Sequence, residues 1–467
     1  MTLKHWALVG GAVACLSPLQ TLSAPWIGTG DLRERHVLQS RADSGQINQT
    51  VTTWPIQKKS VRRSTEPGES IRLTFEGSSE RPLLRSFSAE PREPGELDAE
   101  FAYQGNWWAI GVSPSVVANP ADEDRFRMDG SYLSMEVFNW HFGVGAIERW
   151  WGPGWQSSLV LSDNARPAPG LWFNRADEKP FQTPLLSWIG PWQLTVAVSQ
   201  LEQEREVSEP LWIGIRGTFR PAEGLDIGLT RTFLFGGEGR PSSPGTFWDA
   251  FAGNDNPRDS SEDPSNQLGA VDARYGFGIG EQTAGIYAQM MGEDEAGGFP
   301  ARKSWLIGAD ATTGLWGREQ RWFIEGVDTL ADNLLGDPRP DISYEHRVYR
   351  TGYRYKGRNM AASVDSDSQA LTLGYYDFSG SGSMFGASIS WLDLLGNPDS
   401  RVTVPDPDIE YLVPARDQSI LVVTTHYEMP LRVGKISFFA QLAEDKIEVR
   451  SGELDQLSVS ARWTHSF

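Results

Sequence analysis

The chain has 467 residues, of which 39% are hydrophobic, and its formal net charge at pH 7 is −19. A protein that binds nucleic acid needs clustered lysine and arginine to neutralise phosphates, so this acidity argues against nucleic acid as a partner. The mean hydropathy is −0.39, and after the N-terminus there is no run of ~18 apolar residues that could cross a membrane as a helix. These values exclude a nucleic-acid-binding protein and a helical membrane protein.

Residues 1–24 have the layout of a secretory signal peptide. A basic start precedes the apolar stretch 6–16, and the small residues Ser23 and Ala24 offer a cleavage site. The single cysteine, Cys15, lies inside this segment, so the mature chain needs no disulfide bond. As a weaker alternative, Cys15 is the lipid-bearing cysteine of a lipoprotein. Either interpretation predicts that the protein is exported.

Residues 25–70 are predicted to form an N-terminal periplasmic segment, which consists of a short helix and a linker. Asp31 is a suitable N-cap for a helix over residues 32–44, and Glu34 three residues later completes an approximate capping box. The apolar residues of this helix do not gather on one face. The polar stretch 57–70 is interpreted as a loop or linker.

From about residue 71 the hydrophobic pattern changes to a period of two. Segments of about 8–12 residues with alternating apolar and polar side chains follow one another, separated by turn residues, as in a transmembrane barrel. The clearest is 271–279, in which Val, Ala, Tyr, Phe and Ile alternate with Asp, Arg and Gly. No linker interrupts this array, so residues 71–467 are predicted to form one closed, all-β, transmembrane antiparallel barrel.

Charged residues stand in the middle of several predicted strands, and aromatic residues gather near strand ends. The aromatic residues are typical of the girdles of a barrel at the two membrane interfaces. The charged residues are expected to face the lumen and to pair with one another. They are Asp226, Arg274, Arg350, Arg354 and Arg462.

The last segment, Leu457–Phe467, alternates apolar and polar residues and ends on an aromatic residue. The closing strand of a barrel has one face toward lipid and one toward the lumen, and so shows this pattern. The terminal Phe467 resembles the signal that the bacterial barrel-assembly machinery reads. We expect this strand to close the barrel against a first strand near Asp98 or just before it.

Connections between the predicted strands are unequal in length. Short turns on the periplasmic side and long loops on the extracellular side are typical of outer-membrane barrels. The predicted short turns include 221–224 and 313–314. The predicted long and polar connections are 236–266, 292–300, 328–341 and 396–417.

Two neighbouring stretches in the middle of the chain carry a specific resemblance. The first is Glu148-Arg149-Trp150-Trp151-Gly152-Pro153-Gly154-Trp155, and the second ends in Asn164-Ala165-Arg166-Pro167. Shorter similarities lie around residues 25–55 and 83–97. Together these stretches resemble the Wzi family of capsule assembly proteins, outer-membrane barrels that attach capsular polysaccharide to the cell surface.

The resemblance implies a barrel of about 18 strands in the bacterial outer membrane, with periplasmic helices plugging its inner end. It also implies a non-catalytic lectin that binds capsular or extracellular polysaccharide. The family carries an extended helical segment between Pro55 and Leu83, where this chain has only the mostly polar residues 56–82. We therefore expect the pore to be closed by inward loops or to be more open.

The motif also has a physical interpretation of its own. The Gly-Pro-Gly run at 152–154 forces a bend and allows close backbone approach, and the flanking tryptophans can pack over it. We interpret these tryptophans as structural, and a sugar-stacking platform is the alternative. Arg149 and Arg166 are expected to bond Glu148, Asp163 or other carboxylates of the lumen.

Contacts with polysaccharide are expected from aromatic rings and polar groups of the long external loops. By position and residue type, the candidates are Phe247, Trp248, Asp249 and Tyr411. Outer-membrane lipid and lipopolysaccharide are the other expected partners. The chain has no zinc-type His/Cys spacing and no phosphate-binding glycine loop, so no metal and no cofactor is predicted.

Three rival functions remain open. The short segment before the barrel leaves room for a diffusion channel. Asn139 and His141 on one strand face leave room for a barrel hydrolase, although no recognisable serine motif accompanies them. A soluble, tryptophan-rich, carbohydrate-binding protein of the periplasm is the third.

Deletion of Phe467 is expected to impair assembly in the outer membrane, because the closing strand then lacks the aromatic residue on which it ends. Heat-modifiable migration and fractionation with the outer membrane measure this assembly. Normal insertion of the shortened chain would count against the barrel prediction.

Overall fold

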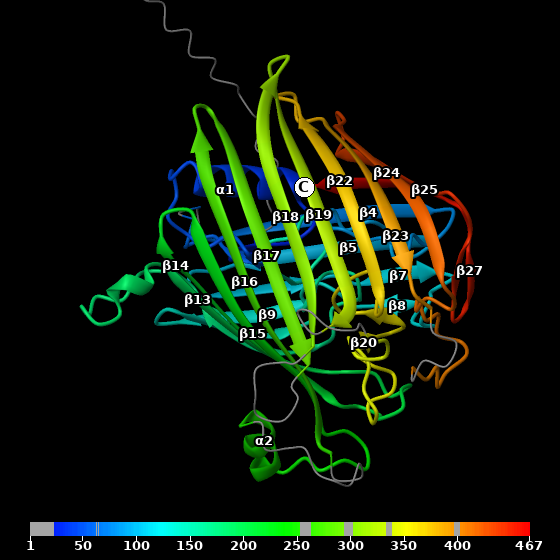
Figure 1. Cartoon of the computed structure of the whole chain (residues 1–467). Coiled ribbons are helices and arrows are strands. Elements are labelled where there is room, and N and C mark those ends of the chain that lie inside the picture. Colours follow the sequence, from blue (N-terminus) through cyan, green and yellow to red (C-terminus); the bar gives the residue numbers. More distant parts are fainter. Residues whose placement is uncertain are drawn as a thin grey trace, which may run out of the picture.

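The computed structural model describes residues 23–61, 63, 65–252, 263–293, 302–332, 339–396 and 402–467. Within these ranges the chain forms a closed antiparallel barrel with a wall of 18 strands, which confirms the predicted fold class (Figure 1). The wall elements are β4 (Gly68–Ser78), β5 (Gly95–Gln104), β6 (Trp108–Val112), β7 (Ser115–Ala118), β8 (Phe126–Arg127), β9 (Tyr132–Val137), β10 (Trp140–Gly145), β12 (Gly170–Arg175), β13 (Trp192–Gln200), β14 (Leu211–Ala222), β15 (Leu225–Phe235), β16 (Ser265–Ile279), β17 (Gln282–Glu293), β18 (Lys303–Leu315), β19 (Arg318–Asp332), β22 (Ser368–Phe378), β23 (Met384–Leu394), β24 (Gln418–Pro430), β25 (Lys435–Ala443) and β28 (Leu457–Ser466). β6 and β7 both pair with β5, so they are two parts of one interrupted wall strand. β9 pairs with β6 and β8 pairs with β7, so β8 and β9 are likewise two parts of the next wall strand.

The barrel closes where β28 pairs with β4. Trp463 lies opposite Phe75, and the backbone N–H of Phe467 donates to the carbonyl of Ile71 over 2.9 Å. The expected partner near Asp98 was wrong, because Asp98 lies on β5, the next strand of the wall. Within β4, Glu76 is buried on the lumen face, whereas Ile71 and Phe75 are exposed on the outer face, as expected of a wall strand.

The alternation of the strands places apolar side chains outside and polar side chains inside. On β17, Ile286 points outward with 58% of its surface exposed, whereas Gln289 on the other face is fully buried. On β18, Ile307 is 60% exposed in the same way. An apolar belt exposed to water is unfavourable, whereas such a belt around a barrel is the surface that a lipid bilayer covers.

No helix among the described residues is long and apolar enough to cross a membrane.

Asp226, Arg274 and Arg462 lie on wall strands, as the sequence predicts, and each has an oppositely charged partner. The Nε of Arg220 lies 2.6 Å from Oδ1 of Asp226, and the Nε of Arg462 lies 2.7 Å from Oε2 of Glu76. Such charge-assisted contacts are strong where little water competes for them.

Arg350 and Arg354 do not lie on wall strands, so that part of the prediction was wrong, although Arg354 pairs with Asp365 as expected of a buried charge. Both belong to the segment 339–367 between β19 and β22, which folds into the barrel instead of running along its wall. Arg354 opens β20 (Arg354–Tyr355), which pairs with β21 (Arg358–Asn359). A basic residue among apolar ones has the same local pattern in a wall strand and in an inward loop, so the pattern could not distinguish them.

The two ends of the barrel differ. The turn end carries the tight turns, and both the start of β4 and the end of β28 lie there, whereas the loop end carries long connections such as the one that contains α2 (Figure 1). The turn between β18 and β19 lies at Trp316 and Gly317, just beyond the predicted 313–314, since β18 continues to Leu315. Their φ values of 55° and 70° are those of a type I′ hairpin turn. The loop end also carries β26 (Ile447–Val449) and β27 (Gly452–Leu454), and a single 3-10 turn, η1 (Ser187–Ile189), precedes β13.

The helix α1 (Leu32–Asp43) lies inside the barrel near the turn end, where it contacts β16 and β17 (Figure 1). It begins as predicted, with Oδ1 of Asp31 accepting a hydrogen bond of 2.9 Å from the N–H of Glu34. The helix is polar because the lumen wall that it contacts is polar. This explains why its apolar residues do not gather on one face.

Ion pairs tie α1 to the wall. The Nη1 of Arg274 lies 2.6 Å from Oδ1 of Asp43, and its Nη2 lies 3.0 Å from Oδ2 of Asp310. The amide of Gln39 donates to Asp310 over 3.1 Å. The chain around the helix completes this N-terminal filling with three short strands, β1 (Trp26–Ile27), β2 (Thr53–Trp54) and β3 (Ile56–Gln57), of which β1 and β3 pair.

Replacing Arg274 with Ala is expected to loosen α1, because Asp43 then keeps a buried negative charge without its partner. Removing one member of a buried pair costs about 3–5 kcal/mol. Trypsin should then cut at the arginines of α1, and planar bilayers should show openings that the unaltered protein lacks. Arg416→Ala, at a side chain that is 58% exposed, is the control and should change neither readout. Equal resistance of Arg274→Ala and the unaltered protein to trypsin would contradict this role.

Candidate functional site

The motif of tryptophans lies in the connection between β10 and β12, which folds back into the lumen. Its strand β11 (Trp150–Trp151) pairs with β2, with Trp150 opposite Trp54 and Trp151 opposite Thr53. Trp150, Trp151 and Trp155 are fully buried. Rings without an exposed face cannot stack on a sugar, so we assign them a packing role.

Glu325 of β19 holds the turn that follows the motif. One carboxylate oxygen lies 2.7 Å from the backbone N of Trp155, the other lies 2.7 Å from that of Ser157, and the hydroxyl of Tyr287 donates to it over 2.9 Å. The backbone approaches so closely that a Cβ on Gly154 would lie 2.2 Å from the carbonyl of Ser157. Glycine is therefore required at this position.

Arg35 connects α1 to the same turn. Its Nη2 donates to the carbonyl oxygens of Pro153 and Gly154 over 2.9 and 2.6 Å. The guanidinium carbon lies 4.3 Å from the ring centroids of both Phe87 and Trp155. Cation–π contacts of this kind are stronger when both groups are desolvated. The N-terminal filling and the motif are thus one packed unit.

The second stretch of the motif forms ion pairs and hydrogen bonds with neighbouring loops. The Nε of Arg166 lies 2.7 Å from Asp129, its Nη1 lies 2.9 Å from Asp124, and it also bonds Asp122. The amide of Asn164 donates to the carbonyl of Asn359 over 2.8 Å. The adjacent residues Ala165 and Pro167 are buried. Arg166 therefore pairs with carboxylates of the lumen, as predicted.

The other predicted pairing of the motif is different. Glu148 is bonded by Arg92 over 2.7 Å. Arg149 donates to the carbonyl of Ile147 over 3.1 Å, and its guanidinium lies 5.3 Å from the ring centroid of Trp172. The expectation that Arg149 bonds a carboxylate was therefore wrong, because its guanidinium instead lies against the ring of Trp172, a wall residue whose proximity the local pattern does not show.

Asp163 is an unusual buried carboxyl group beside the motif. It has no exposed surface, and neither of its carboxylate oxygens has a hydrogen-bond partner among the described residues. Arg85 donates to its backbone carbonyl over 3.0 Å instead. Burial raises the pKa of Asp163 to about 7, an effect that Arg85 opposes and Glu148 reinforces. This carboxyl group can therefore hold a proton near neutral pH.

Both stretches of the motif border one small hollow of about 40 Å³. Glu148, Arg149 and Arg166 line it together with Ser199 and Trp212 of the wall. A hollow of this size holds a few water molecules, which the charged and hydroxyl groups of its lining can bind. The structure thus brings the predicted motif residues together, and most of their contacts are with the chain segments that fill the lumen.

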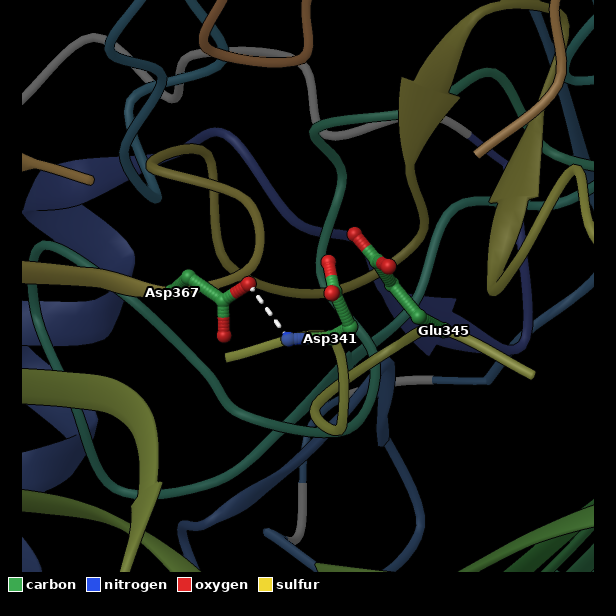
Figure 2. A group of neighbouring side chains, drawn as sticks. All are labelled: Asp341, Glu345 and Asp367. Carbon is green, nitrogen blue, oxygen red and sulfur yellow. Dashed lines mark hydrogen bonds between the residues drawn. The ribbon is translucent and has the colours of Figure 1, made fainter. Parts of the chain in front are cut away.

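A group of three carboxylates, which sequence reasoning missed, lies within the segment 339–367 (Figure 2). Asp341, Glu345 and Asp367 each offer one oxygen, and these oxygens all lie within 4.8 Å of one another. The backbone N–H of Asp341 donates to Oδ2 of Asp367 over 2.8 Å, across 26 positions of the chain. No spacing rule links acids so far apart, and their residue type was the only available signal.

Three of the predicted polysaccharide residues lie on α2 (Pro244–Phe251), in the connection between β15 and β16 at the loop end (Figure 1). Trp248 is 63% exposed and Asp249 is exposed beside it. Phe247 is half-buried, with its ring centroid 5.5 Å from that of Phe235. The helix therefore presents one open indole and one carboxylate.

The fourth predicted residue, Tyr411, is placed differently. It is fully buried, in a cluster with Val402, Ile409 and Val413. Its ring has no open face for a sugar, and it belongs to a different cluster from α2. We therefore do not keep Tyr411 among the proposed contacts with polysaccharide.

His141 has two partners, and neither is a serine. Its Nδ1 lies 2.8 Å from Oε1 of Gln57, and its Nε2 lies 3.2 Å from Oε2 of Glu136. Asn139 donates to the carbonyl of Asp177 over 2.9 Å instead of orienting the imidazole. This geometry offers the hydrolase alternative no nucleophile at His141.

Replacing Glu325 with Ala is expected to release the motif, since two backbone N–H groups and a tyrosine hydroxyl lose their acceptor. Each buried donor left unsatisfied costs about 1–3 kcal/mol. Hydrogen–deuterium exchange at residues 150–158 should therefore become faster. Glu319→Ala, on the same strand but with a carboxylate that is 73% exposed, should leave this exchange unchanged. Slow exchange in both variants would contradict the role of Glu325.

Comparison with known proteins gives a matching family and a relative. A family model described as the capsule assembly protein Wzi matches residues 63–389. A protein of Klebsiella pneumoniae, described as an uncharacterized 55.8 kDa protein in the cps region, is 31% identical over 325 residues. The match covers 63% of this chain and 64% of that relative, slightly less than two thirds of its length.

A solved structure agrees over nearly the whole chain. It is described as Wzi, an outer membrane protein involved in group 1 capsule assembly in Escherichia coli and a carbohydrate-binding β-barrel. The TM-score is 0.80 at 23% identity, and the match covers 95% of this chain and 100% of the other, so the two share a fold. Since the family model covers well over half of the chain, this protein belongs to the Wzi family of capsule assembly proteins, which are outer-membrane β-barrels.

Proposed function

We propose that the protein is a non-catalytic outer-membrane lectin that holds capsular or extracellular polysaccharide at the cell surface. The observation that carries this proposal is a capsule-assembly barrel whose lumen is filled by its own chain. Because the lumen is filled, a polymer can contact the loop end of the barrel but has no open pore to enter. The related Escherichia coli structure is described as carbohydrate-binding, which supports the same class of ligand.

The filling argues against the rival diffusion channel. Trp54 and Phe87 pack edge to face with ring centroids 5.0 Å apart, and Phe87 and Trp150 pack likewise at 5.5 Å. These rings come from three segments far apart in the sequence and meet inside the barrel. We therefore expect no steady conductance from the unaltered protein. The segments that fill the lumen are 24–61, 79–94, 146–169 and 339–367.

We place the loop end outside the cell and the turn end, with α1, toward the periplasm. Short turns in the periplasm and longer loops outside are the usual arrangement of such barrels. In this orientation the apolar belt contacts outer-membrane lipid and lipopolysaccharide. The closing strand, which ends at the exposed Phe467, is the element that we propose the barrel-assembly machinery recognises.

We propose that α2 supplies one contact with polysaccharide. Ala250 is buried on the helix, and the ring of Phe247 lies 6.2 Å from that of Phe233, so one side of α2 is anchored to the barrel. The indole of Trp248 remains open, with the carboxylate of Asp249 next to it. An aromatic face can stack on the C–H groups of a sugar ring while a carboxylate accepts bonds from its hydroxyl groups.

Trp248→Ala is expected to weaken retention of polysaccharide on cells, because the open stacking face is lost. Loss of one such contact costs about 1–2 kcal/mol, which is a five- to thirtyfold weaker association. Labelled polysaccharide bound per cell measures the effect at equal amounts of folded barrel.

Trp316→Ala is the matched control. Trp316 is also a tryptophan on a tip and is 84% exposed, but it lies at the turn end. Its replacement should leave retention unchanged. Equal retention by Trp248→Ala and the unaltered protein would remove α2 from the proposal, and steady conductance in planar bilayers would favour a channel.

A further inference from the structure

The group formed by Asp341, Glu345 and Asp367 buries an excess of negative charge. Glu345 is 3% and Asp367 is 2% exposed. Arg354 is the nearby cation, and its guanidinium is already bonded by both carboxylate oxygens of a fourth acid, Asp365. This guanidinium and the four carboxylates lie close together in a region with little water.

Asp367 gives a second and independent sign of a ligand. One of its carboxylate oxygens is directed toward the backbone N–H of Asp341 (Figure 2). Its Oδ2 accepts from the backbone of Asp341, but its Oδ1 is buried and has no hydrogen-bond partner among the described residues. A buried carboxylate oxygen without a partner is unfavourable, so carboxylates buried in this way pair or coordinate metals.

The spacing of the oxygens suits a divalent cation. A calcium ion binds oxygens at about 2.3–2.6 Å, so ligands on opposite sides of it are up to about 5 Å apart. The three oxygens of this group lie within 4.8 Å of one another. The donors are all oxygen, which favours a hard cation such as Ca²⁺ over zinc or copper.

We propose that Asp341, Glu345 and Asp367 form a binding site for a hard divalent cation of the Ca²⁺ class. The site joins residues near the start of the segment 339–367 to its last residue, so a bound ion would hold the two ends of the segment together. No metal was predicted from the sequence, and this proposal revises that expectation. It does not depend on polysaccharide binding.

The electrostatics of the group are consistent with this assignment. Burial, with a smaller contribution from the negative charges of Glu345, Asp341 and Asp365, raises the pKa of Asp367 to about 8 against the hydrogen bond from the backbone of Asp341. A bound cation would stabilise the ionised carboxylates and displace the proton.

The segment 339–367 is part of the filling. The hydroxyl of Tyr344 donates to the carbonyl of Leu159 over 2.9 Å, and the indole of Trp212 donates to the hydroxyl of Tyr353 over 2.7 Å. The ion would therefore fix the part of the lumen filling that lies against the motif on the loop side.

Calcium binding to the purified, full-length protein tests the proposal. The protein in detergent is freed of cations with EDTA and titrated with calcium chloride in a calorimeter. We expect one site with a Kd of roughly 10⁻⁴–10⁻³ M, the range of extracellular calcium modules. Calcium should also slow tryptic cleavage after Arg347 and Arg350, which are exposed on the segment.

Asp367→Asn and Glu345→Gln keep the shape of the side chain and remove one charge. Each is expected to weaken calcium binding at least tenfold and to abolish protection from trypsin. Asp408→Asn, at an exposed acid in the connection between β23 and β24, is the control and should bind calcium like the unaltered protein. Comparison of the variants also separates this site from calcium held by co-purified lipopolysaccharide.

The proposal would be overturned if Asp367→Asn and Glu345→Gln bound calcium as tightly as the unaltered protein. It would also be overturned if the unaltered protein bound no calcium. Heat-modifiable migration verifies that each variant is a folded barrel. If a variant does not assemble, the proposal is tested by comparing the tryptic cleavage of the unaltered protein in calcium with its cleavage in EDTA. Equal cleavage rates in the two conditions would then also overturn the proposal.

Discussion

Charges inside the barrel have to neutralise one another, because a filled lumen leaves little water to screen them. Arg274 lies between Asp43 of α1 and Asp310 of the wall, and Arg35 of the same helix bonds the turn of the tryptophan motif. Each of these contacts joins segments that are far apart in the sequence. Since the loss of either partner leaves a buried charge or an unsatisfied group, the helix, the motif and the wall stabilise one another.

This interdependence separates the role of the motif from the binding of a ligand. The stretch that is most specific to the family consists of buried tryptophans, whose contacts are with Glu325, Arg35 and the strand β2. A motif of this kind identifies how the lumen is filled. Residues that meet the polymer have to be exposed, and Trp248 on α2 has that property. Such surface residues carry no pattern that packing would impose.

The sequence predicted those features that depend on local pattern. Alternation predicted the barrel and the closing strand, and the N-cap at Asp31 predicted α1. It could not predict which connections fold inward, because that depends on contacts such as the one between Glu325 and Trp155, which are 170 positions apart. Tyr411 and Arg354 were misplaced for this reason, and the three carboxylates around Asp367 were missed for it. In each case the local residue types were compatible with both an outer loop and an inward one.

The seam between β4 and β28 has a consequence for the order of folding. Nearly every other wall strand pairs with a neighbour in the sequence, whereas this seam brings together residues such as Ser78 and Ser458, which are 380 positions apart. Contacts at such separation form late, because closing so long a loop is entropically costly. The N-terminal filling directly precedes β4, and a ring that had already closed would offer it no side entrance. The filling must therefore be enclosed when the seam forms or enter later through an end of the barrel.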